Sequence, residues 1–97
     1  MKITTKTGFQ FEVDERVFTD YRFVDAIAQA SDPDDKVGEL KGTTELVNLI
    51  FGSQKKAFMD HISSNNDGYI PAEVVNDELK FIFAEYNAIK NSSSSEG

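Results

Sequence analysis

The stretch from Ile62 to Val74, ISSNNDGYIPAEV, contains residue types that could coordinate calcium between two helices. An EF-hand loop supplies oxygen ligands at alternate positions, a glycine at position 6 and a bidentate glutamate at position 12. With Gly68 at position 6, the side chains of Ser63 and Asp67 fall at positions 1 and 5. The first half of the loop therefore resembles a calcium site.

The second half of the loop departs from the pattern. Position 12 is Val74, and Glu73 falls one residue too early to be the bidentate ligand. A turn explains the same residues, because Asn65 and Asn66 tolerate the left-handed conformation that ends a helix and Pro71 suits the start of the next one. We predict a helix–helix turn without a metal site.

The remaining residues of catalytic type are isolated along the sequence. His61 has no cysteine or second histidine at ligand spacing, and Asp34 and Asp35 are explained as charges at the start of a helix. No phosphate-binding glycine loop and no nucleophile-elbow motif occurs in the sequence. We predict no catalytic residue, no cofactor and no enzymatic activity.

Composition limits the remaining function classes. The 97 residues carry a net charge of −7, which disfavours nucleic acid as a partner, and no apolar run reaches the length that spans a membrane. The chain has no cysteine, so disulfides are excluded. Its eight Phe and three Tyr are enough for a core and for a surface that binds other proteins. Residues 1–90 are predicted to form one compact domain, and residues 91–97 a disordered serine-rich tail.

The predicted fold class is α+β, with an N-terminal β-hairpin packed on four to five α-helices. Phe9, Phe11 and Val13 alternate with polar residues, as in a half-buried strand, and Gly8 follows Lys6 in the expected turn. The first helix is expected over 17–30, with a buried stripe of Val17, Tyr21, Val24 and Ala28 widened by Phe23 and Ile27.

Further helices are expected along the rest of the chain. Asp32 and Pro33 favour the start of a short helix that Gly38 and Gly42 bracket, and later helices are expected over 44–51, 53–62 and 71–90. The core is predicted to contain the apolar residues at these periodic positions: Phe9, Phe11, Leu46, Leu49, Ile50, Phe58, Ile62, Leu79 and Ile82.

The last predicted helix carries more apolar residues than one core requires. Its main stripe holds Val75, Leu79, Ile82, Tyr86 and Ile89. A second seam holds Val74, Phe81 and Ala88, spaced by seven, and Glu78 and Glu85 lie between the two. The seam is buried by another helix of the chain, or it is a strip that binds a partner; the sequence leaves both open.

The order of these parts is similar to that of the small tail assembly chaperones of long-tailed, siphovirus-type phages that infect Gram-positive bacteria. The similar segments are GFQFEVDERVFTDYRFVDAIAQ, an acidic stretch, LVNLIFGSQKKAFMDHI, DGYIPAEVVNDELKFIF and a short polar tail. The resemblance implies a non-enzymatic protein of the host bacterial cytoplasm that binds the tape measure protein and the tail tube protein, and that could bind a second copy of itself.

Two other function classes compete with a phage morphogenesis chaperone. A calcium-binding helix-loop-helix regulator would need the metal site that the loop only half matches. An acidic adaptor or DNA-mimicking inhibitor would need its charges on one continuous face, whereas the acidic residues of this chain are scattered over every segment.

Overall fold

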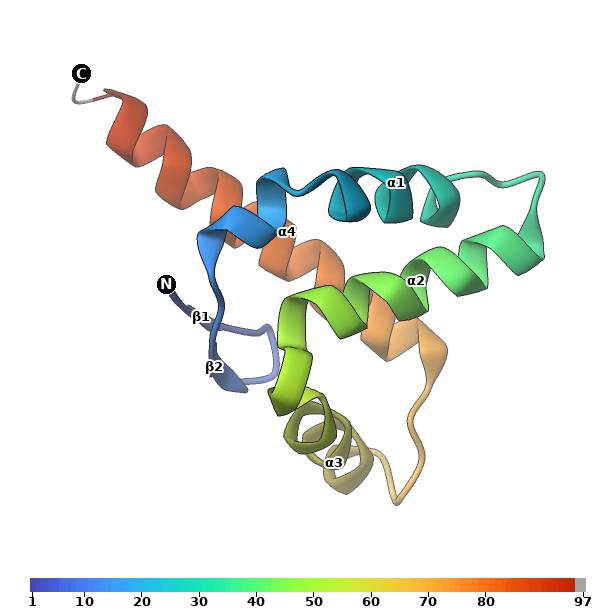
Figure 1. The fold of residues 1–97 in the computed structure, drawn as a ribbon. Coiled ribbons are helices and arrows are strands. Elements are labelled where there is room, and N and C mark those ends of the chain that lie inside the picture. The colour runs from blue at the N-terminus through green and yellow to red at the C-terminus, as the bar shows by residue number, and fades with distance from the viewer. Residues whose placement is uncertain (96–97) are drawn as a thin grey trace. The chain divides into compact units, whose positions relative to one another are not determined.

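The computed structural model describes residues 1–95, with side chains as far as residue 91 (Figure 1). The described chain is α+β, which confirms the predicted class. Its elements in chain order are the strands β1 (Lys2–Thr4) and β2 (Gln10–Glu12), the 3-10 helix η1 (Glu15–Thr19), the helices α1 (Tyr21–Ala30) and α2 (Lys36–Phe51), the 3-10 helix η2 (Gly52–Gln54), and the helices α3 (Lys55–Asn65) and α4 (Ala72–Ser95).

The predicted hairpin is confirmed, and Gly8 makes its tight turn. The amide of Gly8 donates to the carbonyl oxygen of Thr5 at 3.0 Å, and the amide of Thr5 donates to the carbonyl oxygen of Phe9 at 2.8 Å. Gly8 has a φ of +94°, which a side chain would make unfavourable. Alternation along the strands buries Phe11 and Val13, while Phe9 is half-buried.

The predicted stripe of Val17, Tyr21, Val24 and Ala28 is wrong, because the segment is two helices rather than one, although Phe23, predicted beside that stripe, is buried. The chain leaves η1 at Asp20, whose extended backbone and side chain cap α1, so the helical phase restarts there. The side chains that α1 buries are Phe23 and Ala26, whereas Tyr21 is 79% exposed and Val24 is 53% exposed.

Two segments predicted as separate helices form the single helix α2, so the described chain has four α-helices where five helical segments were predicted. Asp35, not Asp32, is its N-cap, and its carboxylate accepts the amide of Gly38 at 2.9 Å. Gly42 does not stop the helix. A β-carbon built on Gly42 would lie 2.6 Å from the carbonyl oxygen of Ala26, so the absence of a side chain lets α1 and α2 approach closely.

Most of the predicted core is confirmed. The structure buries the predicted Phe11, Leu46, Ile50, Phe58, Ile62, Leu79 and Ile82, but Phe9 and Leu49 are only half-buried. The core also contains apolar residues outside that list, the largest of which are Phe18, Phe23 and Phe51, and of these Phe23 was predicted for the stripe of the first helix.

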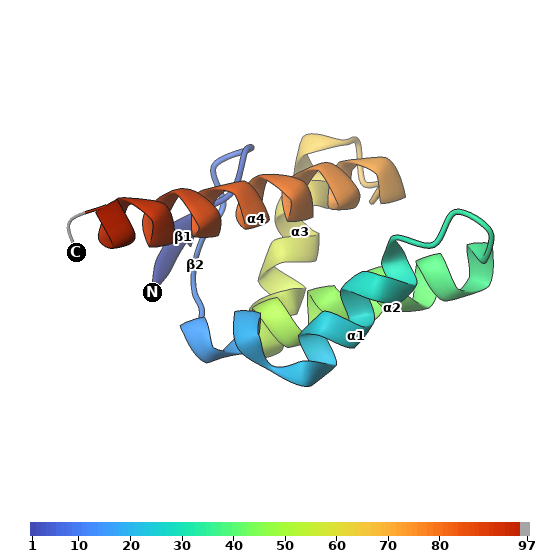
Figure 2. The ribbon, with the colours of Figure 1, turned by 90° about the horizontal axis from the view of Figure 1, so that it is seen from above.

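The described chain groups into two compact units. One contains Met1 and the segment 12–56, and in it α1 lies along α2 (Figures 1 and 2). The other contains 2–11 and the chain from residue 57, and in it the ring of Phe9 lies 5.6 Å from that of Phe58. The single domain expected over residues 1–90 stays a prediction.

The predicted disordered tail, 91–97, overlaps the end of α4, which continues to Ser95. Residues 96–97 lie outside the described residues, and the disorder of the tail stays a prediction. Within residues 1–95, no helix combines the length and the apolar character needed to cross a lipid bilayer.

Candidate functional site

The stretch that resembles a calcium loop connects α3 to α4 through a helix-ending motif. The amide of Gly68 donates to the carbonyl oxygen of Ser63 at 2.8 Å, and Asp67 between them has a φ of +55°. A left-handed residue followed by a six-to-one hydrogen bond is the Schellman geometry that ends helices. The left-handed residue is thus Asp67, rather than Asn65 or Asn66.

Asn66 uses its side chain in the same turn. Its amide group donates to the carbonyl oxygen of Ile62 at 2.8 Å, which satisfies a carbonyl left free at the end of α3. Among the residues that the structure describes, no three His, Asp or Glu side chains are grouped closely enough to hold a metal ion. The polar residues of the turn therefore have a structural explanation, and the absence of a metal site stays a prediction.

The histidine lies in a polar cluster that the sequence did not predict. The hydroxyl of Thr7, in the hairpin turn, lies 2.8 Å from a carboxylate oxygen of Glu78 and 2.9 Å from Nε2 of His61. The amide of Thr7 also donates to Glu78 at 3.3 Å. Glu78 is 1% exposed, so this carboxylate is a buried acceptor that links the hairpin to α4.

The direction of these hydrogen bonds decides what the cluster can do. The hydroxyl of Thr7 donates its single proton to the carboxylate of Glu78. Nε2 of His61 lies 2.9 Å from the oxygen of that hydroxyl and 3.3 Å from the side-chain nitrogen of Asn65, and whether it donates or accepts depends on its tautomer. A histidine that activates a nucleophile has to accept the hydroxyl proton instead. The cluster is therefore arranged to hold the hairpin turn against α3 and α4 rather than to activate Thr7.

The five residues of the predicted partner strip differ in exposure along α4. Val74 and Phe81 are half-buried, Ala88 and Glu85 are exposed, and Glu78 is buried against Thr7. Glu78 thus presents no charge to a partner. The exposed part of the strip lies toward the end of the helix.

The main stripe of α4 shows the same gradient. Val75, Leu79 and Ile82 are at most 6% exposed, but Ile89 on the same stripe is 38% exposed. From residue 84 to residue 91 the structure fully buries no side chain, and Tyr86 of the main stripe is half-buried. About two turns of α4 therefore extend beyond its buried part and carry apolar side chains into solvent.

A groove between α1 and α2 is a second candidate surface. It encloses about 600 Å³, and its lining comes from one stripe of each helix: Arg22, Asp25, Ala26 and Gln29 of α1, and Val37, Leu40, Lys41, Thr44 and Glu45 of α2. Val37 and Leu40 are each 63% exposed. The groove has an apolar end at these two residues and a charged end near Arg22 and Glu45.

Sequence reasoning missed the groove because it divided α2 at its glycines. If 36–51 is read as one helix, Val37, Leu40 and Thr44 recur at intervals of three and four and share a face. That face differs from the one that holds the buried Leu46 and Ile50. Predicting one continuous helix over 36–51 would thus have revealed a second face that carries the apolar residues Val37 and Leu40.

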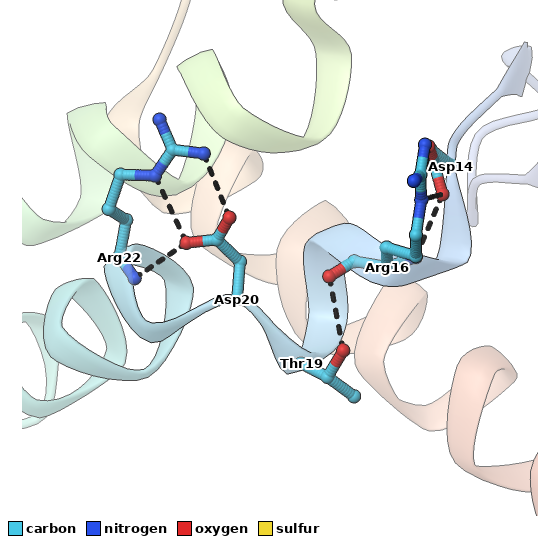
Figure 3. Close-up of polar contacts among 5 residues, drawn as sticks. All are labelled: Asp14, Arg16, Thr19, Asp20 and Arg22. Carbon is cyan, nitrogen blue, oxygen red and sulfur yellow. Dashed lines mark hydrogen bonds and ion pairs between the residues drawn. The ribbon is translucent and has the colours of Figure 1, made fainter.

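Two aspartates at helix starts each bind the arginine two residues further along (Figure 3). Asp20 accepts the amide and the guanidinium of Arg22, both at 2.8 Å, and Asp14 binds Arg16 in the same way. Hydrogen bonds from the arginine side chains lower the pKa of each aspartate to about 2. These exposed pairs cap η1 and α1, and they fix Arg22 beside the charged end of the groove.

The geometry offers two surfaces suited to protein partners, the groove between α1 and α2 and the exposed end of α4. Neither surface identifies a family by itself, and the similarity to phage tail assembly chaperones rests on the order of sequence segments described above. Comparisons with protein-family models, with curated proteins and with solved structures find no match to this chain.

Proposed function

We propose that this chain is a non-enzymatic assembly chaperone of phage tails, acting in the host bacterial cytoplasm. Its partners would be the tape measure protein and the tail tube protein, which it would bind during tail morphogenesis. The proposal combines the order of sequence segments with one structural observation: α4 continues past its last buried side chain, Ile82, and exposes Ala88 and Ile89.

The exposed end of α4 supports a binding role for a thermodynamic reason. Beyond Ile82 the helix buries side chains such as Tyr86 only in part, so it gains less from tertiary packing there than in its first turns, and short helices are marginal in water on their own. A partner that covered Ile89 would bury apolar area and stabilise these turns at the same time. The partner would therefore be selected by an apolar surface that matches a helix.

Co-expression with candidate tail proteins, followed by affinity capture, tests this function. The tag belongs on the partner, because the N-terminal ammonium of this chain donates to the carbonyl oxygen of Val13 at 3.0 Å and its C-terminal helix is the proposed surface. Capture of the wild-type chain by the tape measure protein or the tail tube protein is expected. The proposal is wrong if neither protein captures the folded chain.

A pair of variants locates the contact. Ile89→Ser removes an exposed apolar side chain from α4, and Val24→Ser removes one that is 53% exposed on α1. Both should fold as the wild type does, because neither side chain is in the core. Ile89→Ser should reduce capture by about tenfold, as loss of an apolar anchor does, while Val24→Ser should not. Equal capture of both variants would remove the end of α4 from the interface.

A further inference from the structure

The groove between α1 and α2 has the form of a helix-binding site. Its two walls are the stripe of Arg22, Asp25 and Gln29 on α1 and the stripe of Val37, Lys41 and Thr44 on α2. Both stripes recur every three or four residues, so the groove runs along the two helices, which lie side by side in Figures 1 and 2. A third helix laid along it would complete a three-helix arrangement.

Small residues lie where α1 and α2 pack on each other beside the groove. Gly42 approaches the backbone of Ala26 and Ala30 without an intervening side chain, and Ala26 lies at the bottom of the groove. The longer side chains stand along both sides. A partner helix could therefore insert apolar side chains between the walls without moving either helix.

The apolar end of the groove adjoins the loop that connects α1 to α2. Val37 and Leu40 are one helical turn apart on α2, and each is 63% exposed although large and apolar. Two exposed apolar neighbours on one wall are the kind of anchor point that an amphipathic helix covers.

The charge around this end is strongly acidic. The exposed aspartates Asp32, Asp34 and Asp35 lie within five residues before Val37, and Glu39 lies two residues after it. Two basic residues lie beside the same apolar pair: Lys36, whose ammonium lies 3.5 Å from the carboxylate of Glu39, and Lys41, which follows Leu40 and lines the groove. A partner that covers Val37 and Leu40 thus meets an excess of negative charge beside its apolar contacts.

This charge selects among the possible occupants of the groove. A second copy of the chain would bring another acidic loop and another net charge of −7 to the same place. Nucleic acids and anionic membranes would be repelled for the same reason. A helix with basic residues beside its apolar stripe has the complementary charge.

We infer that the groove between α1 and α2 binds an amphipathic α-helix whose apolar stripe packs on Val37 and Leu40 and whose basic residues lie against the acidic loop 32–35. The inference rests on the proposed function only for the natural source of that helix, a tail protein. The groove, its exposed apolar pair and its charge are independent of that source and of the end of α4.

A synthetic helix tests the inference with the purified full-length chain. The probe is a fluorescently labelled peptide of about 20 residues, with leucines on one helical stripe and lysines on both flanks. Two matched peptides replace either the lysines by glutamate or the leucines by serine. Fluorescence anisotropy gives the Kd of each peptide, and circular dichroism checks that every protein variant is folded.

Three protein variants separate the groove from general charge attraction. Val37→Ser/Leu40→Ser removes the apolar pair, Asp32→Asn/Asp34→Asn reduces the acidic charge without touching the N-cap Asp35, and Tyr21→Ser removes an exposed apolar residue that does not line the groove. We expect the leucine–lysine peptide to bind wild type and Tyr21→Ser equally. The apolar double variant should bind at least about tenfold more weakly, and the aspartate variant should bind more weakly with a smaller salt dependence.

Two outcomes would overturn the inference. Equal binding of the leucine–lysine peptide to wild type and to Val37→Ser/Leu40→Ser would show that charge alone recruits it. Self-association that disappears in the same double variant would assign the groove to a second copy of the chain. Binding of the peptide with no capture by tail proteins would keep the groove and reject the proposed function. Capture by tail proteins with no binding of the peptide to the wild-type chain would keep the proposed function and reject the groove.

Discussion

Gly42 shows how one residue determines the packing of two helices. Its missing side chain leaves the backbones of Ala26 and Ala30 in direct contact with α2. In Gly42→Ala the new methyl group meets backbone atoms, which cannot rotate away as the end of a side chain can. The helices must separate, and both the packing of α1 on α2 and the floor of the groove change.

Gly42→Ala is therefore expected to lower the free energy of unfolding by about 1–3 kcal/mol through overpacking. This loss exceeds the gain of up to about 1 kcal/mol that alanine brings to a helix interior. Gly38→Ala in the same helix is the comparison, because its methyl group meets only the side chain of Asp35, which can move at the cost of weakening its cap on the amide of Gly38, so a smaller loss is expected. Urea denaturation of both variants measures the difference. A Gly42→Ala protein as stable as wild type would show that α1 and α2 do not approach as closely as described.

Glu78 is the second residue at which a single group determines packing. Its buried carboxylate accepts both the hydroxyl and the amide of Thr7, so the hairpin turn and α4 depend on one acceptor. Each carboxylate oxygen accepts one of these two bonds, so in Glu78→Gln the NH₂ group takes the place of one acceptor and that bond is lost. We expect the variant to lose roughly 1–3 kcal/mol of stability, because the NH₂ group at position 78 is buried and faces a donor of Thr7 instead of accepting from it.

Glu85→Gln is the matched control for Glu78, since it makes the same change at an exposed position of the same helix. It should stay within about 0.5 kcal/mol of wild type. A double-mutant cycle with Thr7→Val isolates the pair, and coupling is expected because the two residues are in contact. Additive effects in the cycle would contradict the described link between the hairpin and α4.

At the scale of elements, the sequence was informative where periodicity was local. The alternation of Phe9, Phe11 and Val13 and the turn at Gly8 predicted the hairpin, and the stripe of Leu79 and Ile82 predicted the buried face of α4. Each of these patterns depends on neighbours within a few residues, and nothing interrupts it.

The errors arose where the local pattern was interrupted. Asp20 ends one helix and caps the next, which rotates the buried face of α1 away from Tyr21 and Val24. Gly42 suggested a helix end, whereas the glycine serves contact with a helix that precedes it by more than ten residues. The groove was missed for the same reason, and the cluster of Thr7, His61 and Glu78 joins residues too distant in sequence for any periodicity to reveal.

The caps of η1 and α1 give the fold a defined response to acid. The pKa of Asp20 is lowered to about 2 by its hydrogen bonds with Arg22, so the native state favours the carboxylate more than the unfolded chain does. A lowered pKa stabilises the native state fully above the ordinary value of about 4, and the contribution is lost as the pH falls toward 2. Part of the loss of stability in that range should come from this cap.

Asp20→Asn keeps an oxygen that can cap α1 but cannot be protonated in this range. Its stability should therefore fall less steeply than that of wild type between about pH 4 and pH 2. Arg22→Gln should have a similar effect, because it removes the cation that lowers the pKa. Thermal unfolding at a series of pH values measures both slopes, and an unchanged slope in Asp20→Asn would assign the acid response to other carboxylates.

At the scale of the molecule, segments that are distant in sequence belong to the same compact unit. Residues 2–11 group with the chain from residue 57, although the segment 12–56, which forms its own unit, lies between them in sequence. The contact of Phe9 with Phe58 and the hydrogen bonds of Thr7 to Glu78 are both internal to one unit. The contact of Phe18 with Phe23, with ring centroids 5.4 Å apart, is internal to the other.

This grouping predicts that the two units open with different free energies. Phe9→Ala should remove roughly 2 kcal/mol from the unit that contains α3 and α4, since a half-buried phenylalanine costs less than a fully buried one. Amide hydrogens there should then exchange more than about tenfold faster, while those of α1 and α2 change less. Phe23→Ala should give the opposite pattern. Hydrogen–deuterium exchange with peptide resolution distinguishes these outcomes, because a chain that opens only as one domain would show the same acceleration in both units for each variant.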